Sequence, residues 1–305
     1  MLRQLNLIDG KLIESPNGSG AVCVYIAPDE GERKFLVEQL RIDEHTLNSS
    51  LDPDEPSRLE FEPEHVALIF KRPKRYGSGD NFLFKVASAG AFMFKERLVV
   101  VVAEEDVPLF EGRPFAKVQS IQDVVLRLIY RSISHFVEHI RGIDAISGEL
   151  EQHIYVSMEN KYLVNLFTLE KSLVYYLNAI NSNGMLIEKL KNSAAKIGFS
   201  PENIEFLDDI LIENNQCRIQ TEIYSQVLAS LMDARASIVS NNLNIRIKAL
   251  TLITIAIMVP TLIVSVFSMN VRIPLAWYDH AFWIISAIAG MSATTIGVLW
   301  WKRRW

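Results

Sequence analysis

The chain has 305 residues, with 31 Lys and Arg against 36 Asp and Glu, and a formal net charge of −5. Between residues 249 and 301 only Arg272 and Asp279 are charged. This uneven distribution excludes a single soluble globule, and a hydrophobic content of 49% excludes a largely disordered chain. Because the chain is acidic and its longest basic run is 302–304, we do not expect it to bind nucleic acid.

Residues 1–118 are predicted to form a cytoplasmic α+β domain, a mixed sheet with helices. Short runs of β-branched and aromatic residues predict strands at 21–26, 59–61 and 65–70, and a meander of strands at 82–86, 91–94 and 98–102 with turns at 88–90 and 95–97. Residues 32–51 are predicted to be helical.

Residues 119–199 are predicted to form a helical hairpin of the same domain. Apolar residues recur at helical spacing from Ile121 to Ile133, and a second helix is expected over about 158–196, broken near 181–184. A new helix is then predicted to start at residues 200–201, because Ser200 suits the N-cap and Pro201 the first helical position.

The new helix is predicted to run without a break through 200–267. No proline follows Pro201 until Pro260, and no glycine occurs in between. At 1.5 Å per residue such a helix is roughly 100 Å long, so it needs neighbours, either the earlier hairpin or copies of itself, to bury its apolar side chains.

Two uncharged segments, 249–271 and 281–301, are each long enough to cross a bilayer, which takes about 20 apolar residues. We expect the first span at about 249–267, an external loop at 268–280, a second span at 281–301 and a basic tail at 302–305. Basic residues lie just before the first span, at Arg246 and Lys248, and just after the second. They predict a multi-pass protein of the inner or plasma membrane, in contact with its lipids, with both termini in the cytoplasm.

Other chemistry is sparse in the sequence. Cys23 and Cys217 are too few for a disulfide framework. His135 and His139 share a helix face, but no third ligand completes a zinc site, so packed or solvated histidines are expected. No nucleophile–base pair and no nucleotide-binding motif stands out, and we expect neither an enzyme nor a bound cofactor.

The end of the first span reads Phe267-Ser268-Met269-Asn270-Val271. It follows a long acidic helix, in which residues 200–243 carry seven acidic and two basic side chains. This order of features, with two C-terminal spans and a basic tail, resembles the CorA family of magnesium transporters. That family carries Gly-Met-Asn at this turn, and relatives described as zinc transporters carry Gly-Ile-Asn.

The resemblance implies a homopentamer with a cytoplasmic funnel, in which the first span of each subunit lines a pore. It implies a selectivity filter at Ser268, Met269 and Asn270, and a pore face formed by Asn244, Ile247, Leu250, Thr254, Met258 and Thr261. The transported ion is expected to be Mg²⁺, with Co²⁺ or Ni²⁺ as further candidates, moving inward down its electrochemical gradient and acting also as a candidate regulator.

Three departures from the family pattern leave alternatives open. Ser268 replaces the family glycine, and the loop has a single acidic residue, Asp279, beside Arg272. The family's regulatory metal pair maps onto Asp209 and, without gaps, onto Ser49, so that Asp52 and Asp54 are the nearest carboxylates. Two alternatives are therefore a zinc or broad transition-metal transporter of the same fold, and a non-conducting membrane-anchored scaffold.

Overall fold

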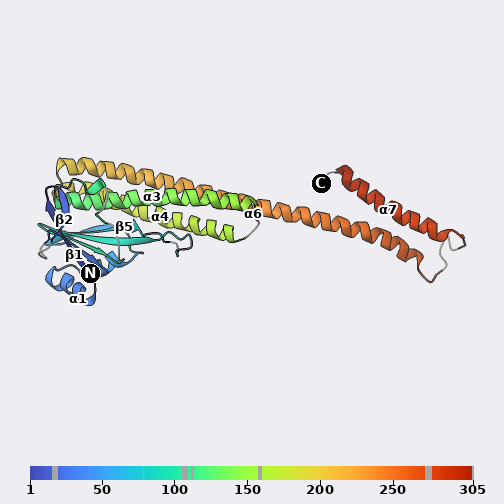
Figure 1. The fold of residues 1–305 in the computed structure, drawn as a ribbon, viewed down its shortest axis with the longest axis horizontal. Coiled ribbons are helices and arrows are strands. Elements are labelled where there is room, and N and C mark those ends of the chain that lie inside the picture. The colour runs from blue at the N-terminus through green and yellow to red at the C-terminus, as the bar shows by residue number, and fades with distance from the viewer. Residues whose placement is uncertain are drawn as a thin grey trace. The chain divides into compact units, whose positions relative to one another are not determined.

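The computed structural model describes residues 1–15, 20–77, 79–104, 109–110, 113–156, 160–271 and 277–303. They divide into two compact units, Met1–Met232 and Asp233–Trp305. The first unit contains a sheet and most of the helices, and the second contains the C-terminal part of one long helix and the last helix (Figure 1).

The first unit is built on a seven-stranded sheet with the order β2-β1-β3-β7-β6-β5-β4. All neighbouring strands are antiparallel except β3 and β7, which are parallel, so the predicted mixed sheet is confirmed. The strands are β1 (Leu2–Ile8), β2 (Lys11–Glu14), β3 (Val22–Ile26), β4 (Arg58–Phe61), β5 (His65–Pro73), β6 (Val86–Phe94) and β7 (Leu98–Val102).

Helices cover both faces of this sheet. One face carries α1 (Glu30–Lys34), the π-helical turn η1 (Phe35–Gln39) and α2 (Glu44–Leu51), and the other carries α3 (Ile121–Val156) and α4 (Asn160–Asn192). Because side chains alternate along a strand, Val22 and Val24 of β3 join the core under α3 and α4, whereas Cys23 and Tyr25 join the smaller core under α2. Burial on both faces explains why β3 and β7 are almost continuously apolar.

Several local predictions for the N-terminal part were wrong. The helix expected over 32–51 is divided into α1, η1 and α2, because the Asp43 side chain caps a new helix by accepting from Thr46 N at 2.9 Å. The turn expected at 88–90 does not exist, since β6 runs straight through Gly90. A side chain there would clash, because an added Cβ would lie 2.6 Å from Cβ of Ser50 in α2. The strands β1 and β2 were not predicted, and of the strand predicted at 82–86 only Val86 is in a strand.

The helical predictions are confirmed in part. The break expected near 181–184 is wrong, because α4 is continuous there. Gly198, at φ 81°, ends the short α5 (Ala194–Ile197). Ser200 then caps α6 (Pro201–Phe267) by accepting from Asn203 N at 3.2 Å, so the predicted start and the unbroken course of the long helix are confirmed.

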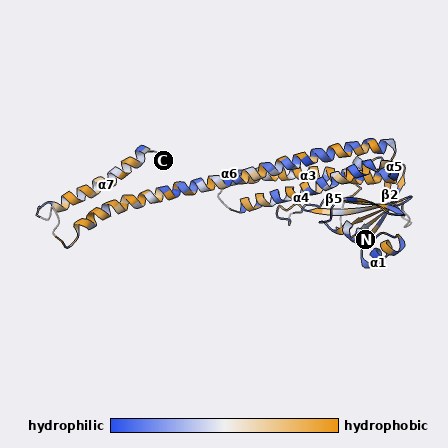
Figure 2. Ribbon diagram, turned by 180° about the vertical axis from the view of Figure 1, so that it is seen from behind, coloured by the Kyte–Doolittle hydropathy of each residue, from blue (hydrophilic) through white to orange (hydrophobic). Residues whose placement is uncertain are grey.

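The part of α6 in the first unit has one buried face. Its buried residues recur at intervals of three, four and seven, as one helix face requires: Asn203, Leu207, Ile210, Asn214, Cys217, Thr221 and Leu228. No described residue of α6 beyond Leu228 is buried. Figure 2 shows the accompanying change in composition, from mixed polar and apolar residues to an almost uniformly hydrophobic end of α6 and a hydrophobic α7 (Ala281–Arg303).

Candidate functional site

Two helices of the described chain, α6 and α7, are long and apolar enough to cross a membrane. In a soluble protein such segments would be buried in a core. Here none of the most apolar window of α6 and only 6% of that of α7 is buried. This exposed apolar surface is what a lipid environment or further protein chains would cover.

The six residues expected to line a pore lie on one face of α6. All of them are exposed in the single chain, Leu250 and Met258 most of all at 66% and 63%. At about 100° per residue, the six fall within an arc of about 120°. They are Asn244, Ile247, Leu250, Thr254, Met258 and Thr261.

The threonines of this face present oxygen acceptors. Thr254 Oγ1 donates to Leu250 O at 2.9 Å, and Thr261 Oγ1 donates to Ile257 O at 2.7 Å. Each hydroxyl proton is therefore engaged within the helix, while the lone pairs stay available to accept hydrogen bonds. Water bound to a cation points its hydrogens outward, so these oxygens suit a hydrated cation.

The basic residues of the same helix segment lie off this face. On an ideal helix Arg246 falls about 40° beyond one edge of the arc and Lys248 about 40° beyond the other. Lys248 is four residues from Asn244, and Arg246 is four residues from Leu250, so both basic residues border the row but are not members of it.

Two further residues on the same arc, Asp233 and Ser240, were not assigned a role from the sequence. Both are exposed, and Asp233 is the only acidic residue of α6 after Glu222. Helical spacing places them on the same face when the arc is extended toward the N-terminus. They continue a polar line on the helix face that includes Asn244.

The proposed filter residues follow directly after α6. Ser268 N and Ser268 Oγ both donate to Ser265 O, at 3.2 and 2.9 Å, which closes the last turn of the helix. Ser268 is not among the described non-glycine residues with positive φ, so a serine meets no backbone penalty here. Met269 and Asn270 are exposed. Arg272 lies outside the described residues, whereas Asp279 is described and exposed.

The residues of the expected regulatory pair lie on different elements of the first unit. Asp209 is exposed on α6, next to Asp208, which pairs with Lys191 at 2.6 Å. Asp52 is the C-cap of α2, and its Oδ1 accepts from Asp54 N at 2.9 Å. Among the described residues no group of three or more His, Cys, Asp or Glu side chains that would hold a metal occurs within one chain.

Ser49, the position that would carry the second regulatory carboxylate, is buried and has a cationic partner. Arg58 Nη2 donates to Ser49 Oγ at 3.1 Å, and Arg58 also pairs with Glu55 and Glu60. A guanidinium therefore lies where a divalent cation would have to bind. This arrangement disfavours a metal ion at Ser49.

The two histidines of α3 are half-buried, and they pack against each other and against Tyr176. The rings of His135 and His139 lie 4.4 Å apart, and His139 Nδ1 is 2.6 Å from the Tyr176 hydroxyl oxygen. Burial lowers the pKa of His135 to about 3 and the pKa of His139 to about 4. Both are neutral in neutral solution, and no third ligand approaches them within the described residues.

Comparison with known proteins gives matches over almost the whole chain. The family model described as CorA-like Mg2+ transporter protein matches residues 24–304. The cobalt/magnesium transport protein CorA of Methanocaldococcus jannaschii is 23% identical over 274 residues, covering 86% of this chain and 83% of that protein. The protein of the same name from Thermotoga maritima is 21% identical over 269 residues, covering 85% and 75%.

A solved structure shares the fold. The complete structure of the CorA magnesium transporter from M. jannaschii superimposes with a TM-score of 0.79 at 18% identity, covering 98% of this chain and 96% of that one. This likeness confirms the predicted α+β domain followed by a long helix and a C-terminal apolar helix.

Proposed function

The chain belongs to the CorA-like Mg²⁺ transporter protein family, and from this membership we propose that it conducts divalent cations, Mg²⁺ first among them, through a membrane. The proposal makes it a transporter and not an enzyme. The row of exposed side chains on one face of α6, from Asn244 to Thr261, is the single observation that carries it.

Conduction requires several copies of the chain, because two spans cannot enclose a pore. The first unit exposes large apolar side chains in a line along α6, at Ile212, Ile219, Ile223 and Val227. Spacings of seven and four place them on one face, which neighbouring copies would cover. We take the number of copies, five, from the family resemblance.

In this assembly α6 of each copy lines the path. Ile247, Leu250 and Met258 form apolar constrictions that gate by dewetting, and Asn244 and the threonines form polar steps between them. Arg246 and Lys248 border this face but are not members of it, whereas a ring of basic side chains within the path would repel cations.

Asn270 is proposed as the filter residue at the outer end. Mg²⁺ releases its water reluctantly, and a ring of amide oxygens would hold the hydrated ion through its waters. From 244 to 270 the chain contains neither His nor Cys, the usual ligands of zinc, which favours Mg²⁺ over Zn²⁺. A doubly charged ion gains about 4.6 kcal/mol on crossing 100 mV, so inward flux needs no ATP.

The proposed transporter lies in the inner or plasma membrane with both termini in the cytoplasm, and the basic flanks of the spans support this orientation. Control by internal Mg²⁺ would act through Asp209 of one copy and Asp52 of the next. Both carboxylates are exposed in the single chain, as an inter-subunit site requires.

Ion flux into liposomes that contain the purified full-length protein tests the proposal. Mg²⁺, Co²⁺, Ni²⁺ and Zn²⁺ are compared at a fixed potential, negative inside. Asn270→Ala should abolish Mg²⁺ flux and leave the oligomer intact, whereas Asn241→Ala, an exposed asparagine about 60° off the arc, should conduct like the parent. Ser268→Gly should preserve or raise the flux.

Three results would overturn parts of the proposal. If Asn270→Ala conducts Mg²⁺ as well as the parent does, Asn270 is not the filter residue. Preferred uptake of Zn²⁺ replaces the magnesium assignment with the transition-metal alternative. An intact oligomer that passes none of the four cations supports a membrane-anchored scaffold.

A further inference from the structure

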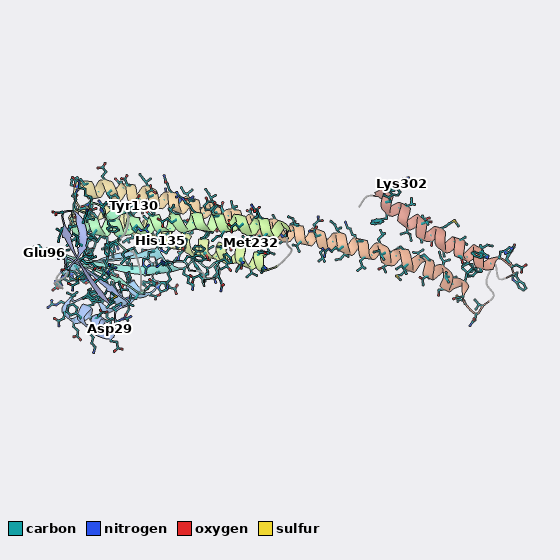
Figure 3. The ribbon with its side chains drawn as sticks, viewed as in Figure 1. Asp29, Glu96, Tyr130, His135, Met232 and Lys302 are labelled. Carbon is teal, nitrogen blue, oxygen red and sulfur yellow. The ribbon has the colours of Figure 1, made fainter. Side chains whose placement is uncertain are left out.

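A pocket of about 480 Å³ opens on the sheet face that α1 covers. It lies outside the ion path, in the first unit, at the end that carries Asp29 and Glu96 in Figure 3. Its floor comes from the first strands of the sheet, one wall from α1 and η1, and one edge from Arg97 in the turn between β6 and β7.

Strand register builds the floor. Leu2 pairs with Tyr25, and Gln4 pairs with Cys23, in the antiparallel ladder of β1 and β3. Alternation along each strand points these four side chains to the same face, where they form a two-by-two patch. Cys23 and Tyr25 are almost fully buried, at 6% and 4%, so the exposed member of the patch is Leu2, at 39%.

Arg97 supplies a positive charge without an anionic partner among the described residues. Arg97 is exposed. Burial raises the pKa of Cys23 and of Tyr25, and the nearby charge of Arg97 lowers both pKa values by a smaller amount. Those two side chains therefore stay neutral, and neither balances the guanidinium.

The only acidic side chain lining the pocket, within the described chain, is Glu32, and it is already engaged. Its Oε2 accepts from Asp29 N in the capping box and from the Met1 amino group, both at 3.2 Å. The pocket thus retains one positive charge that a bound group would neutralise.

The rest of the lining is apolar with one unsatisfied amide. Leu2 and Phe35 are 39% and 44% exposed, and Tyr25, which also lines the pocket, is 4% exposed. Gln4 Oε1 is buried with no hydrogen-bond partner among the described residues.

We propose that this pocket binds a small organic anion, a monocarboxylate with an aliphatic or aromatic body. The volume falls within the range of about 300–1,000 Å³ that small-molecule sites occupy. The planar guanidinium of Arg97 matches a carboxylate with two parallel hydrogen bonds, and Leu2, Tyr25 and Phe35 receive the body.

Calorimetric titration of the full-length protein in detergent tests this site. Benzoate and 4-methylpentanoate are the anions, benzamide and 4-methylpentanamide their neutral counterparts, and chloride the anion without a body. We expect the carboxylates to bind at least about tenfold more tightly than the amides, since a charge-assisted hydrogen bond is worth about that much, and chloride not to compete.

Variants of the pocket residues test which side chains bind the carboxylate and which bind the apolar body. Arg97→Gln should remove the tenfold preference for the carboxylate, and Arg97→Lys, which keeps the charge but loses the fork, should retain part of it. Phe35→Ala should weaken acid and amide alike. Arg41→Gln is the matched control, because Arg41 is an exposed arginine that pairs with Glu64 at 2.9 Å away from the pocket, and it should bind like the parent.

Each contrary result overturns the site. Equal affinity for acid and amide would show that the pocket does not recognise the negative charge. Carboxylate binding that is unchanged in Arg97→Gln would show that the carboxylate binds at another site. Failure of both carboxylates to bind at millimolar concentration removes the pocket as a site for this class. None of these results bears on cation flux, which is measured separately.

Discussion

Asn183, in the C-terminal third of α4, forms two hydrogen bonds with the main chain of Lys71 in β5, as a neighbouring strand would. Lys71 N donates to Asn183 Oδ1 at 2.7 Å, and Asn183 Nδ2 donates to Lys71 O at 2.8 Å. The edge strand β4 pairs with β5 only as far as Arg58 opposite Ile69. The amide therefore satisfies backbone groups that the sheet itself leaves without a strand partner, and it attaches the helical layer to the sheet.

Asn183→Ala should lower the stability of the first unit. The change leaves buried backbone groups of β5 and the Ser57 hydroxyl, which donates to the same Oδ1 at 2.8 Å, without their partner. We expect a loss of about 1–3 kcal/mol, seen as a lower midpoint in thermal unfolding of the full-length protein. Asn181→Ala, an exposed asparagine of the same helix, is the control. Equal midpoints for the two variants would contradict the structural role of Asn183.

Acidification should destabilise the first unit through His135 and His139. Because their pKa values in the folded state are about 3 and about 4, below the value of about 6.5 in an unfolded chain, the unfolded state takes up protons first as the pH falls. Their destabilising effect is absent above pH 6.5 and grows down to the folded-state pKa values. Between pH 7.5 and pH 5.5 it should reach about 2 kcal/mol.

The comparison that isolates this effect uses a variant with both histidines changed to glutamine, which retains a polar group near Tyr176. Its thermal midpoint should depend less on pH than that of the parent over this interval. His45→Gln removes an exposed histidine and should keep the parental dependence. Arg72, Arg131 and Glu138 also act on the pair, so a parental pH dependence in the double variant would assign the effect to other groups.

Asp233→Asn should reduce cation flux at low ionic strength by about threefold. In an assembly of copies around one axis the acidic side chain is repeated, and the ring raises the local concentration of cations. The reduction should shrink at high salt, where charges are screened. Glu213→Gln, an exposed acid of α6 that lies off the arc, should leave flux unchanged. A salt-independent reduction would point to a structural effect instead.

The orientation of the spans can be measured with single cysteines. A cysteine at Asp279 should react with an impermeant thiol reagent added outside intact cells, and a cysteine at Lys302 should react only after the membrane is opened. Buried Cys23 and Cys217 give the background in the parent protein. The reverse pattern would reject cytoplasmic termini and with them the inward direction of transport.

Asp209→Ala should change how millimolar Mg²⁺ protects the first unit from protease, if Asp209 and Asp52 of adjacent copies share an ion. Glu213→Gln again serves as the control on the same helix. Equal digestion of the parent protein with and without Mg²⁺ would mean that this regulatory site is absent, as the guanidinium at Ser49 already suggests for that position.

The family resemblance, the mixed sheet and the long helix were predictable from the sequence, and all are confirmed. The unbroken α6 followed from the absence of glycine and proline, and its start from the cap at Ser200, since both signals are local. The six residues of the arc were taken from the family resemblance, and their spacings of three and four are what one helix face requires. The roles of Asn270 and the pore face stay predictions.

The errors arose where a residue serves a distant neighbour. Asn183 and Gly184 suggested a break, but the first pairs with β5, and the second leaves space for Asn214 of α6, which an added Cβ would approach to 3.0 Å. Gly90 suggested a turn but makes room for Ser50. β1 has polar residues at three of its seven positions and a single β-branched residue, Ile8, so it gave no strand signal. The pocket at Arg97 depends on the register of β1 against β3, which no local pattern gives.

The continuity of α6 from Pro201 to Phe267 sets a rule for how the chain can vary. One inserted residue between Leu228 and Asn244 would turn every later side chain by about 100° relative to the face that packs in the first unit. Seven inserted residues, nearly two full turns, would turn them by only about 20°. Homologous chains of this architecture should therefore differ in length here by near-whole helical turns, so that the angle between the buried face and the row from Asn244 to Thr261 is kept even where the residues change.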